Sequence, residues 1–101
     1  MISRQWRGLT RAGQASAYVR HLKEETFPAL RRLSGFRGAS ILKRDVGEGV
    51  EFLIVTEWDS LDAIRAFAGA DVEVAVVPPA VQAMMIEFDR SARHYELVER
   101  Q

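Results

Sequence analysis

Residues 50–58 read VEFLIVTEW and decide the fold, because they place apolar side chains on both faces of one predicted strand. Side chains alternate across a strand, so the even positions from Val50 to Trp58 share one face. The odd positions share the other face, with apolar Leu53 and Val55 at its centre. A strand that is buried on both faces needs a cover on each. Helices can cover one face. We expect a second copy of the chain to cover the other, because 101 residues leave no room for a second sheet.

The segments before this strand predict a strand, a long helix and a hairpin. Residues 2–9 mix apolar and polar side chains without helical spacing, which favours a strand. Apolar side chains recur at steps of three and four over residues 12–33, which predicts a helix. We expect a kink or a break near Phe27, because Pro28 has no backbone N–H to donate. Residues 36–46 form a strand that pairs with the central strand across the turn at residues 47–49, GEG.

The segments after the central strand complete the order β-α-β-β-α-β. Asp59 or Ser60 caps the start of a helix over residues 59–69, and Gly69 ends it. Residues 92–99 predict the last strand of this order. Between the two, alternation over residues 71–77 is compatible with an additional strand on pattern alone, and two prolines open an additional short helix over residues 78–88. This order is the ferredoxin-like plan, an α+β fold with an antiparallel sheet. We expect a single domain over residues 1–101.

The composition is that of a soluble globular protein, with 48% hydrophobic and 28% charged residues. The net charge is zero, from 14 basic and 14 acidic residues, so the chain lacks the cationic field of a nucleic-acid binder. No apolar run is long enough to span a membrane, and Arg4 and Arg7 argue against a signal peptide. The absence of cysteine excludes disulfides and thiolate metal sites and suits the cytoplasm. Two histidines without an acidic cluster do not predict a metal site.

Residues 55–64, VTEWDSLDAI, join a strand-ending Trp, a polar pair and the start of an amphipathic helix. With AVVPP at residues 75–79 and HYEL at residues 94–97, the sequence resembles the antibiotic biosynthesis monooxygenase family over essentially the whole chain. The resemblance implies a dimeric α+β barrel built from two copies of the chain. The family contains cofactor-free oxygenases of polyketide phenols, haem-degrading oxygenases, lactone isomerases and proteins without known activity, so membership does not by itself identify a reaction.

Several positions depart from the residues that this resemblance implies. Trp58 is present, but Ile54 stands where the cofactor-free oxygenases have an Asn, and Ile64 stands where they have a Tyr. Arg7 aligns with an Asn of the haem-degrading members, and residues 61–88 contain no His to serve as their axial ligand. We therefore expect neither haem nor another resident cofactor. An Arg in place of a pocket amide favours an anionic ligand.

The candidate site combines ionisable side chains with an apolar box. His21 and His94 are the only imidazoles and are the candidate general bases. Arg7 is the candidate cation for a developing anion. These three residues also have a structural interpretation. Each His can be a packed or exposed side chain without a catalytic role, and Arg7 can be paired with a Glu on the neighbouring strand. The candidate substrate-binding residues are aromatic or apolar: Trp58, Ile54, Phe67 and Tyr18.

Strand parity predicts how this site is oriented. The resemblance implies that Trp58 lies over a pocket, so the even row of its strand should face the helices. The same alignment places Arg7 on the cavity face, together with Ser3 and Gln5, and turns Trp6 toward the partner subunit. A one-residue register error would exchange all of these assignments.

Two functions from different classes remain open. The first is a monooxygenase-like protein that oxygenates a small aromatic or enolisable substrate without a cofactor, in a pocket between the sheet and the helices. The alternative is a non-catalytic dimeric module for small-molecule binding or stress on the same fold. An isomerase is a third interpretation. The sequence leaves open whether the protein is an enzyme, and a cavity with converging polar groups is the observation that would separate them.

Overall fold

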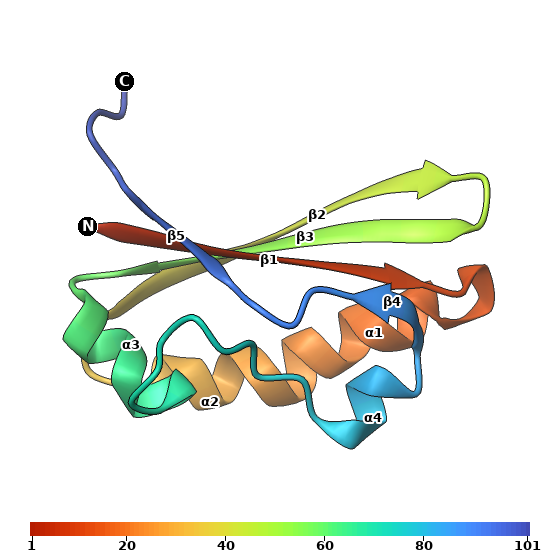
Figure 1. Cartoon of the computed structure of the whole chain (residues 1–101), viewed down its shortest axis with the longest axis horizontal. Coiled ribbons are helices and arrows are strands. Elements are labelled where there is room, and N and C mark those ends of the chain that lie inside the picture. The colour runs from red at the N-terminus through yellow and green to blue at the C-terminus, as the bar shows by residue number, and fades with distance from the viewer.

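The computed structural model describes residues 1–101. They form one sheet, and all the helices lie on one face of it (Figure 1). The five strands are β1 (Ile2–Thr10), β2 (Phe36–Val46), β3 (Gly49–Trp58), β4 (Met85–Phe88) and β5 (Arg93–Glu96). The helical elements are η1 (Ala12–Gln14), α1 (Ala15–His21), η2 (Leu22–Thr26), α2 (Phe27–Arg31), α3 (Leu61–Ala68) and α4 (Pro79–Gln82). No helix is long and apolar enough to cross a membrane.

The sheet is antiparallel throughout and has the strand order β2-β3-β1-β4, with β5 also paired to β1. β4 pairs with the end of β1 at residues 8–10, and β5 pairs with its start at residues 2–5. A two-residue turn joins β2 to β3, as the predicted hairpin requires, with Val46 opposite Gly49. The α+β ferredoxin-like fold with an antiparallel sheet is confirmed.

The long helix changes its winding where the sequence predicts a kink. Residues 22–26 form a π-helical turn between two α-helical segments, and Pro28 lies in the first turn of the second one. In a continuous α-helix the ring of Pro28 would clash with a carbonyl one turn earlier, which would also lose its hydrogen bond. The wider π turn accommodates this change without ending the helix. It also brings Leu22 and Thr26 to the same side, toward the sheet.

Three expectations for the second half of the chain are wrong. Residues 71–77 form no strand and make only an isolated bridge, Val74 to Ser91. The predicted helix over residues 78–88 ends at Gln82, because the chain then enters the sheet as β4. The last strand is shorter than residues 92–99, because its pairing with β1 ends at Glu96, opposite Ile2, and one further backbone hydrogen bond follows, from Leu97 N–H to the Met1 carbonyl at 2.9 Å. The edge of β1 is thus filled by β4 and β5 in turn.

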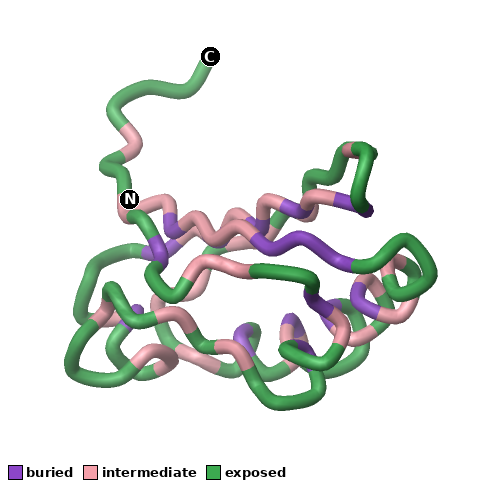
Figure 2. Tube along the Cα trace, turned by 45° about the vertical axis from the view of Figure 1, so that its right-hand side comes forward, coloured by how far each residue is buried: buried purple, intermediate pink, exposed green.

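The core lies between the sheet and the helices, as buried segments on both layers show in Figure 2. The even row of β3 is buried along its whole length, and Phe52 and Trp58 are 0% exposed. The odd row of β3 is half-buried on the other face of the sheet. Exposed apolar side chains on that face include Leu42, opposite Leu53, and Tyr95, opposite Ser3. The two-faced character of the central strand is therefore present in the structure.

Candidate functional site

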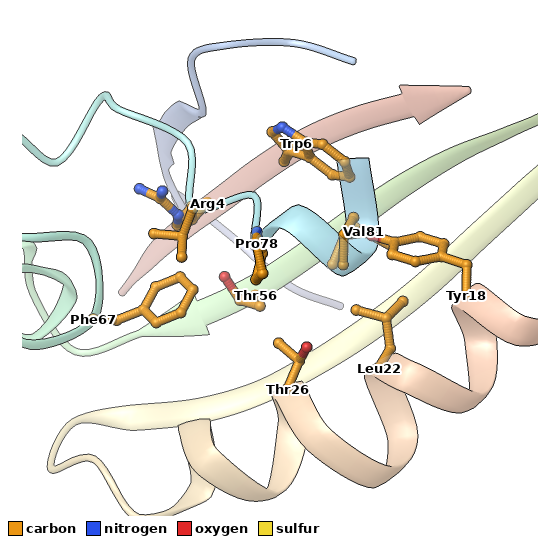
Figure 3. A pocket seen from close by; sticks show the side chains of 11 residues that line it. Arg4, Trp6, Tyr18, Leu22, Thr26, Thr56, Phe67, Pro78 and Val81 are labelled. Carbon is orange, nitrogen blue, oxygen red and sulfur yellow. The ribbon is translucent and has the colours of Figure 1, made fainter. Parts of the chain in front are cut away.

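A cavity of about 70 Å³ lies between the sheet and the helices (Figure 3). Eleven residues line it, from two strands, the long helix, α3, α4 and the segment before α4. They are Arg4, Trp6, Tyr18, Leu22, Thr26, Ile54, Thr56, Phe67, Val76, Pro78 and Val81. The wall is mostly apolar, and its polar groups are one guanidinium and three hydroxyls besides the Trp6 indole.

The sheet supplies one wall of the cavity through strand register. Arg4 lies directly opposite Thr56, and Trp6 lies directly opposite Ile54. Directly opposed residues of an antiparallel pair point to the same face, so all four side chains face the helices. Helix spacing supplies the facing wall, because Tyr18, Leu22 and Thr26 recur every four residues. In Figure 3 Arg4 and Phe67 lie at one end of the cavity, and Tyr18 lies at the other.

Arg4 is a buried cation that has no carboxylate partner. The residue is only 5% exposed. Nη1 donates to the Val72 carbonyl, Nη2 donates to the Val74 carbonyl at 3.1 Å, and the guanidinium lies 5.7 Å from the centre of the Phe67 ring. Burial lowers the pKa of Arg4 from its ordinary value. Neutral carbonyls compensate a buried charge only in part, so this end of the cavity favours an anion.

His94 contacts the same guanidinium from outside the cavity. Nε2 of His94 lies 2.9 Å from Nη1 of Arg4. A guanidinium only donates, so Nε2 must accept, which makes His94 neutral with its proton on Nδ1. Burial lowers the pKa of His94, the charge of Arg4 lowers it further, and Glu73 opposes this shift. His94 therefore helps to hold Arg4 in place, and its Nε2 lone pair is already engaged.

This depressed pKa predicts a pH dependence of stability. Between the folded pKa and the unfolded value of about 6.5, the unfolded chain binds more protons, so the free energy of unfolding falls as pH decreases. The loss begins near the unfolded value and levels off below the folded pKa. We expect His94→Gln to flatten this slope in urea titrations between pH 7.5 and pH 5. His21→Gln is the matched control, and an unchanged slope in His94→Gln would contradict the assignment.

The hydroxyl groups give the cavity hydrogen-bond donors. Tyr18 is 2% exposed and packs edge-on against Phe52, with ring centres 5.0 Å apart. Burial raises the pKa of Tyr18, so its phenol stays protonated and can donate. Thr56 accepts a hydrogen bond of 2.9 Å from Nε1 of Trp58, which leaves its own proton free to orient. An anion or a carbonyl oxygen in the cavity would thus meet donors along its length.

The predicted position of Arg7 is wrong, and that of Trp6 is wrong with it. Arg7 lies opposite Leu53 on the open face of the sheet, where Nε donates to Glu51 at 2.7 Å and Nη2 lies 3.3 Å from Glu87. The hydrogen bond to Glu51 is the main cause that raises the pKa of Arg7. Trp6 faces the cavity instead of a partner, and its Nε1 donates to the Asp89 carbonyl at 2.7 Å. The register of β1 is shifted by one residue from the predicted one.

The predicted positions of Ser3 and Gln5 are wrong for the same reason as that of Arg7, and two more candidate residues lie outside the cavity. Ser3 and Gln5 lie opposite odd positions of β3, so they belong to the open face rather than the cavity face. Trp58 faces the helices as predicted but does not line the cavity, because Phe67 stacks on it with ring centres 6.2 Å apart. Its N–H is already bonded within the core. His21, at the end of α1, is half-buried and does not line the cavity either.

Ile54, Phe67 and Tyr18 do line the cavity, and the other eight lining residues, among them Arg4, Trp6 and Thr26, were not predicted as site residues. One sequence signal could have found Trp6. A Cβ placed on Gly8 would lie 2.6 Å from the Trp6 ring, so the glycine makes room for an indole that folds over the same face. Trp6 and Gly8 share one face of β1, because they are two residues apart. A large aromatic residue at this distance from a glycine in a strand therefore indicates that the even positions of β1 face the core.

The residues of the cavity do not fit haem. The wall contains no His, Cys or Met, so Tyr18 is its sole residue of a type that ligates haem iron. A cavity of about 70 Å³ is also far below the roughly 300–1,000 Å³ of sites for drug-sized ligands. No group of three or more His, Asp or Glu is placed to hold a metal ion. The expectation that haem is not a cofactor stays a prediction.

An antiparallel sheet covered on one face by helices, with a mostly apolar cavity and a buried cation between the two layers, defines a small α+β protein. The chain belongs to the antibiotic biosynthesis monooxygenase family, whose model matches residues 1–84. None of the curated proteins matches the chain.

Solved structures show the same fold at low sequence identity. A Bacillus cereus protein described as a candidate antibiotic biosynthesis monooxygenase is 17% identical with a TM-score of 0.68, covering 99% of this chain and 93% of its own. The haem degrader MhuD from Mycobacterium tuberculosis, solved with two haems in its active site, is 19% identical with a TM-score of 0.61, covering 100% and 99%. A variant of MhuD with two manganese protoporphyrin IX molecules per active site is 20% identical with a TM-score of 0.70, covering 100% and 98%. At these identities the likeness supports the fold alone.

Proposed function

We propose that the protein binds a small planar anion in the cavity and promotes its oxygenation by O₂ without a resident cofactor. The substrate class is phenolic or enolisable, so that ionisation gives an electron-rich phenolate or enolate. The observation that carries this proposal is Arg4, a cationic residue in the cavity wall that is 5% exposed and has no carboxylate partner. A cation in an apolar site stabilises the anionic form of a bound acid.

The reaction needs no external reductant when the substrate carries an acidic CH₂ group. The CH₂ group loses a proton to give the enolate, which Arg4 stabilises. One electron passes from the enolate to O₂, and the substrate radical and superoxide combine, with uptake of a proton, to a hydroperoxide. Loss of water then leaves C=O, so that CH₂ plus O₂ becomes C=O plus H₂O. The carbon loses four electrons and O₂ gains four.

The protein's own contribution in this scheme is binding, charge stabilisation and exclusion of water. No His, Asp, Glu or Lys lines the cavity, so the wall supplies no general base. His21 and His94, proposed from the sequence as bases, both stand outside the wall, and the Nε2 lone pair of His94 is engaged by Arg4. The substrate must therefore be acidic enough to lose its proton to solvent on entry. Trp6, Ile54 and Phe67 provide the apolar surface against which a ring would pack.

Arg4 should give the cavity a measurable preference for anions. We expect benzoate to bind about tenfold more tightly than benzamide, since a charge-assisted hydrogen bond is worth roughly 1.4 kcal/mol more than a neutral one. Titration calorimetry on the unmodified protein measures this ratio directly. Arg4→Gln should remove the preference, whereas Arg11→Gln should keep it, because the exposed Arg11 donates to the Ala83 carbonyl away from the cavity. Equal affinities for the two probes would overturn the anion site.

Oxygenation is tested with the same proteins. Indane-1,3-dione carries an acidic CH₂ between two carbonyls and is a one-substrate probe of the reaction above. After dialysis against chelator, an oxygen electrode should record one O₂ consumed for each C=O formed, at a rate that Arg4→Gln lowers at least tenfold. An uptake no faster than that of the free probe would exclude this chemistry.

A second candidate function is binding without turnover, and the absence of a general base in the wall favours it. In that case benzoate still binds more tightly than benzamide, and no O₂ is consumed with any acidic probe. The calorimetric and electrode measurements together therefore separate a carrier or sensor from an oxygenase.

We further propose that the protein acts as a homodimer, joined through the open faces of two sheets, in the cytoplasm. The half-buried odd row of β3 and the exposed Leu42 support the dimer. The expected mass by light scattering at micromolar concentration is twice the 11.4 kDa of the chain. Leu53→Lys at the centre of that face should give monomers, because a buried unpaired charge is costly. A monomeric unmodified protein would contradict the proposal.

A further inference from the structure

A segment without regular structure, residues 72–77, joins α3 to α4 on the helix side of the sheet, and we call it the cap (Figure 1). Val76 of the cap lines the cavity. At about 70 Å³ the cavity holds roughly two waters, whereas a cavity of about 150 Å³ is needed to hold benzene. An aromatic ligand therefore cannot enter unless some part of the wall moves. The sheet wall is paired along its whole length, and the helix wall is packed against it.

The cap is held by polar contacts on both of its sides, and its two ends also pack against the core through Val72 and Val77. On the inside, Arg4 donates to the carbonyls of Val72 and Val74. On the outside, Ala75 N–H donates to the Arg90 carbonyl at 3.0 Å, and Ala92 N–H donates to the Glu73 carbonyl at 2.8 Å. The middle of the cap contributes little to the core, since Val74 is 51% exposed and Val76 is 43% exposed. Because its middle makes few buried apolar contacts, the cap can open at a lower cost in free energy than the sheet or the long helix.

The two cap carbonyls occupy the positions that a ligand's oxygens would take on Arg4. Each is bound by a different guanidinium nitrogen, Nη1 for Val72 and Nη2 for Val74. A carboxylate or an enolised 1,3-dicarbonyl presents two oxygens to such a fork and makes stronger, charge-assisted hydrogen bonds. His94 stays on Nη1 from the outer side and can keep the guanidinium in place during the exchange.

We propose that the cap is a lid latched by Arg4, and that a planar anion with two adjacent oxygens opens it by replacing the Val72 and Val74 carbonyls on the guanidinium. Release of the cap and capture of the anion are then one exchange, which selects carboxylates and 1,3-dicarbonyl enolates over ligands with one oxygen. This inference rests on the proposed function, because it concerns the same cavity.

A disulfide across the isolated bridge tests the lid. Val74 and Ser91 face each other as a non-hydrogen-bonded antiparallel pair, in which Cα atoms lie about 4.5 Å apart, a distance that a disulfide spans. The chain has no cysteine, so Val74→Cys with Ser91→Cys adds one defined crosslink. We expect the oxidised double variant to bind benzoate at least tenfold more weakly than the reduced one, with recovery on reduction. Val74→Cys alone is the control and should bind equally under both conditions.

The outcomes separate this inference from the proposed function. If the unmodified protein does not bind benzoate, the proposed function fails. If it binds benzoate and the oxidised double variant binds equally well, only the lid is wrong.

Amide exchange gives a second readout that needs no ligand. Arg4→Lys keeps a positive charge but lacks the fork that holds both carbonyls, so the amides of Ala75 and Ala92 should exchange several-fold faster than in the unmodified protein. Arg11→Lys should leave them unchanged. Unchanged exchange in Arg4→Lys would show that Arg4 does not latch the cap.

Discussion

Trp58→Ala is expected to lower the free energy of unfolding by about 4 kcal/mol, because removing a fully buried Trp loses its burial and leaves a cavity. Trp58 is 0% exposed, packs edge-on against Phe36 with ring centres 5.2 Å apart, and stacks on Phe67. The loss should appear as a lower urea midpoint with an unchanged slope.

Trp58→Phe is the matched control and should cost much less, because it keeps an aromatic ring in the same space. It removes the N–H donor to Thr56 but leaves that hydroxyl beside the cavity, where water can reach it. Because Trp58 lies behind Phe67, Trp58→Phe should alter ligand affinity only slightly. A loss below about 2 kcal/mol in Trp58→Ala would show that this end of the core repacks.

Gly49→Ala should lower the free energy of unfolding by about 3 kcal/mol, which is the upper range for forced overpacking. A Cβ on Gly49 would overlap the backbone carbonyl oxygen of Thr10 and lie 3.2 Å from Ile86. Backbone cannot move aside without separating β1 from β3 where the hairpin begins.

Gly47→Ala, in the same turn, tests whether the loss comes from this overlap. Nothing lies within 4 Å of a Cβ at Gly47, so the substitution should change stability by less than about 0.5 kcal/mol. Urea titrations of both variants give the comparison, and equal losses would show that glycine flexibility in the turn, rather than the close approach of β1, limits stability.

The sequence was most informative where pattern and structure are both local. The alternation over residues 50–58 predicted which side chains of β3 share a face, and the resemblance at Trp58 predicted that the even row faces the helices. All five even positions from Val50 to Trp58 are buried. The hairpin and the Ser60 cap also follow from neighbouring residues, and Ser60 accepts the Ala63 N–H as expected. Such signals need no knowledge of distant partners.

The sequence did not allow a correct prediction of which face of the first strand is buried. Arg4, Trp6 and Arg7 are large amphipathic side chains, and both rows of β1 contain one, so composition does not fix which row is inner. The choice is made by pairing with β3, in which Arg4 meets Thr56 and Arg7 meets Leu53. A buried Arg without an acidic partner contradicts the usual expectation for charged residues, so Arg4 was overlooked.

The predicted secondary structure of residues 71–88 is wrong for a different reason. Its alternation is genuine, but a strand forms only where an edge is free to pair, and β4 and β5 occupy the free edge of β1. Residues 71–77 are left to cross the cavity with a single bridge. Local pattern cannot report competition between segments for one edge.

The pairing of β1 also affects the folding rate of this protein, because its partners lie far along the chain. The hydroxyl of Thr10 bonds to a carbonyl 40 residues further on, and Arg4 meets His94 at a separation of 90 residues. Contacts of such long range slow folding, because the loops they close lose entropy before the contacts form. The β2–β3 hairpin can form early, since its strands are adjacent in the chain. On the ribosome β1 is made first and waits without partners, so the buried cation at Arg4 is enclosed only when β5 has emerged.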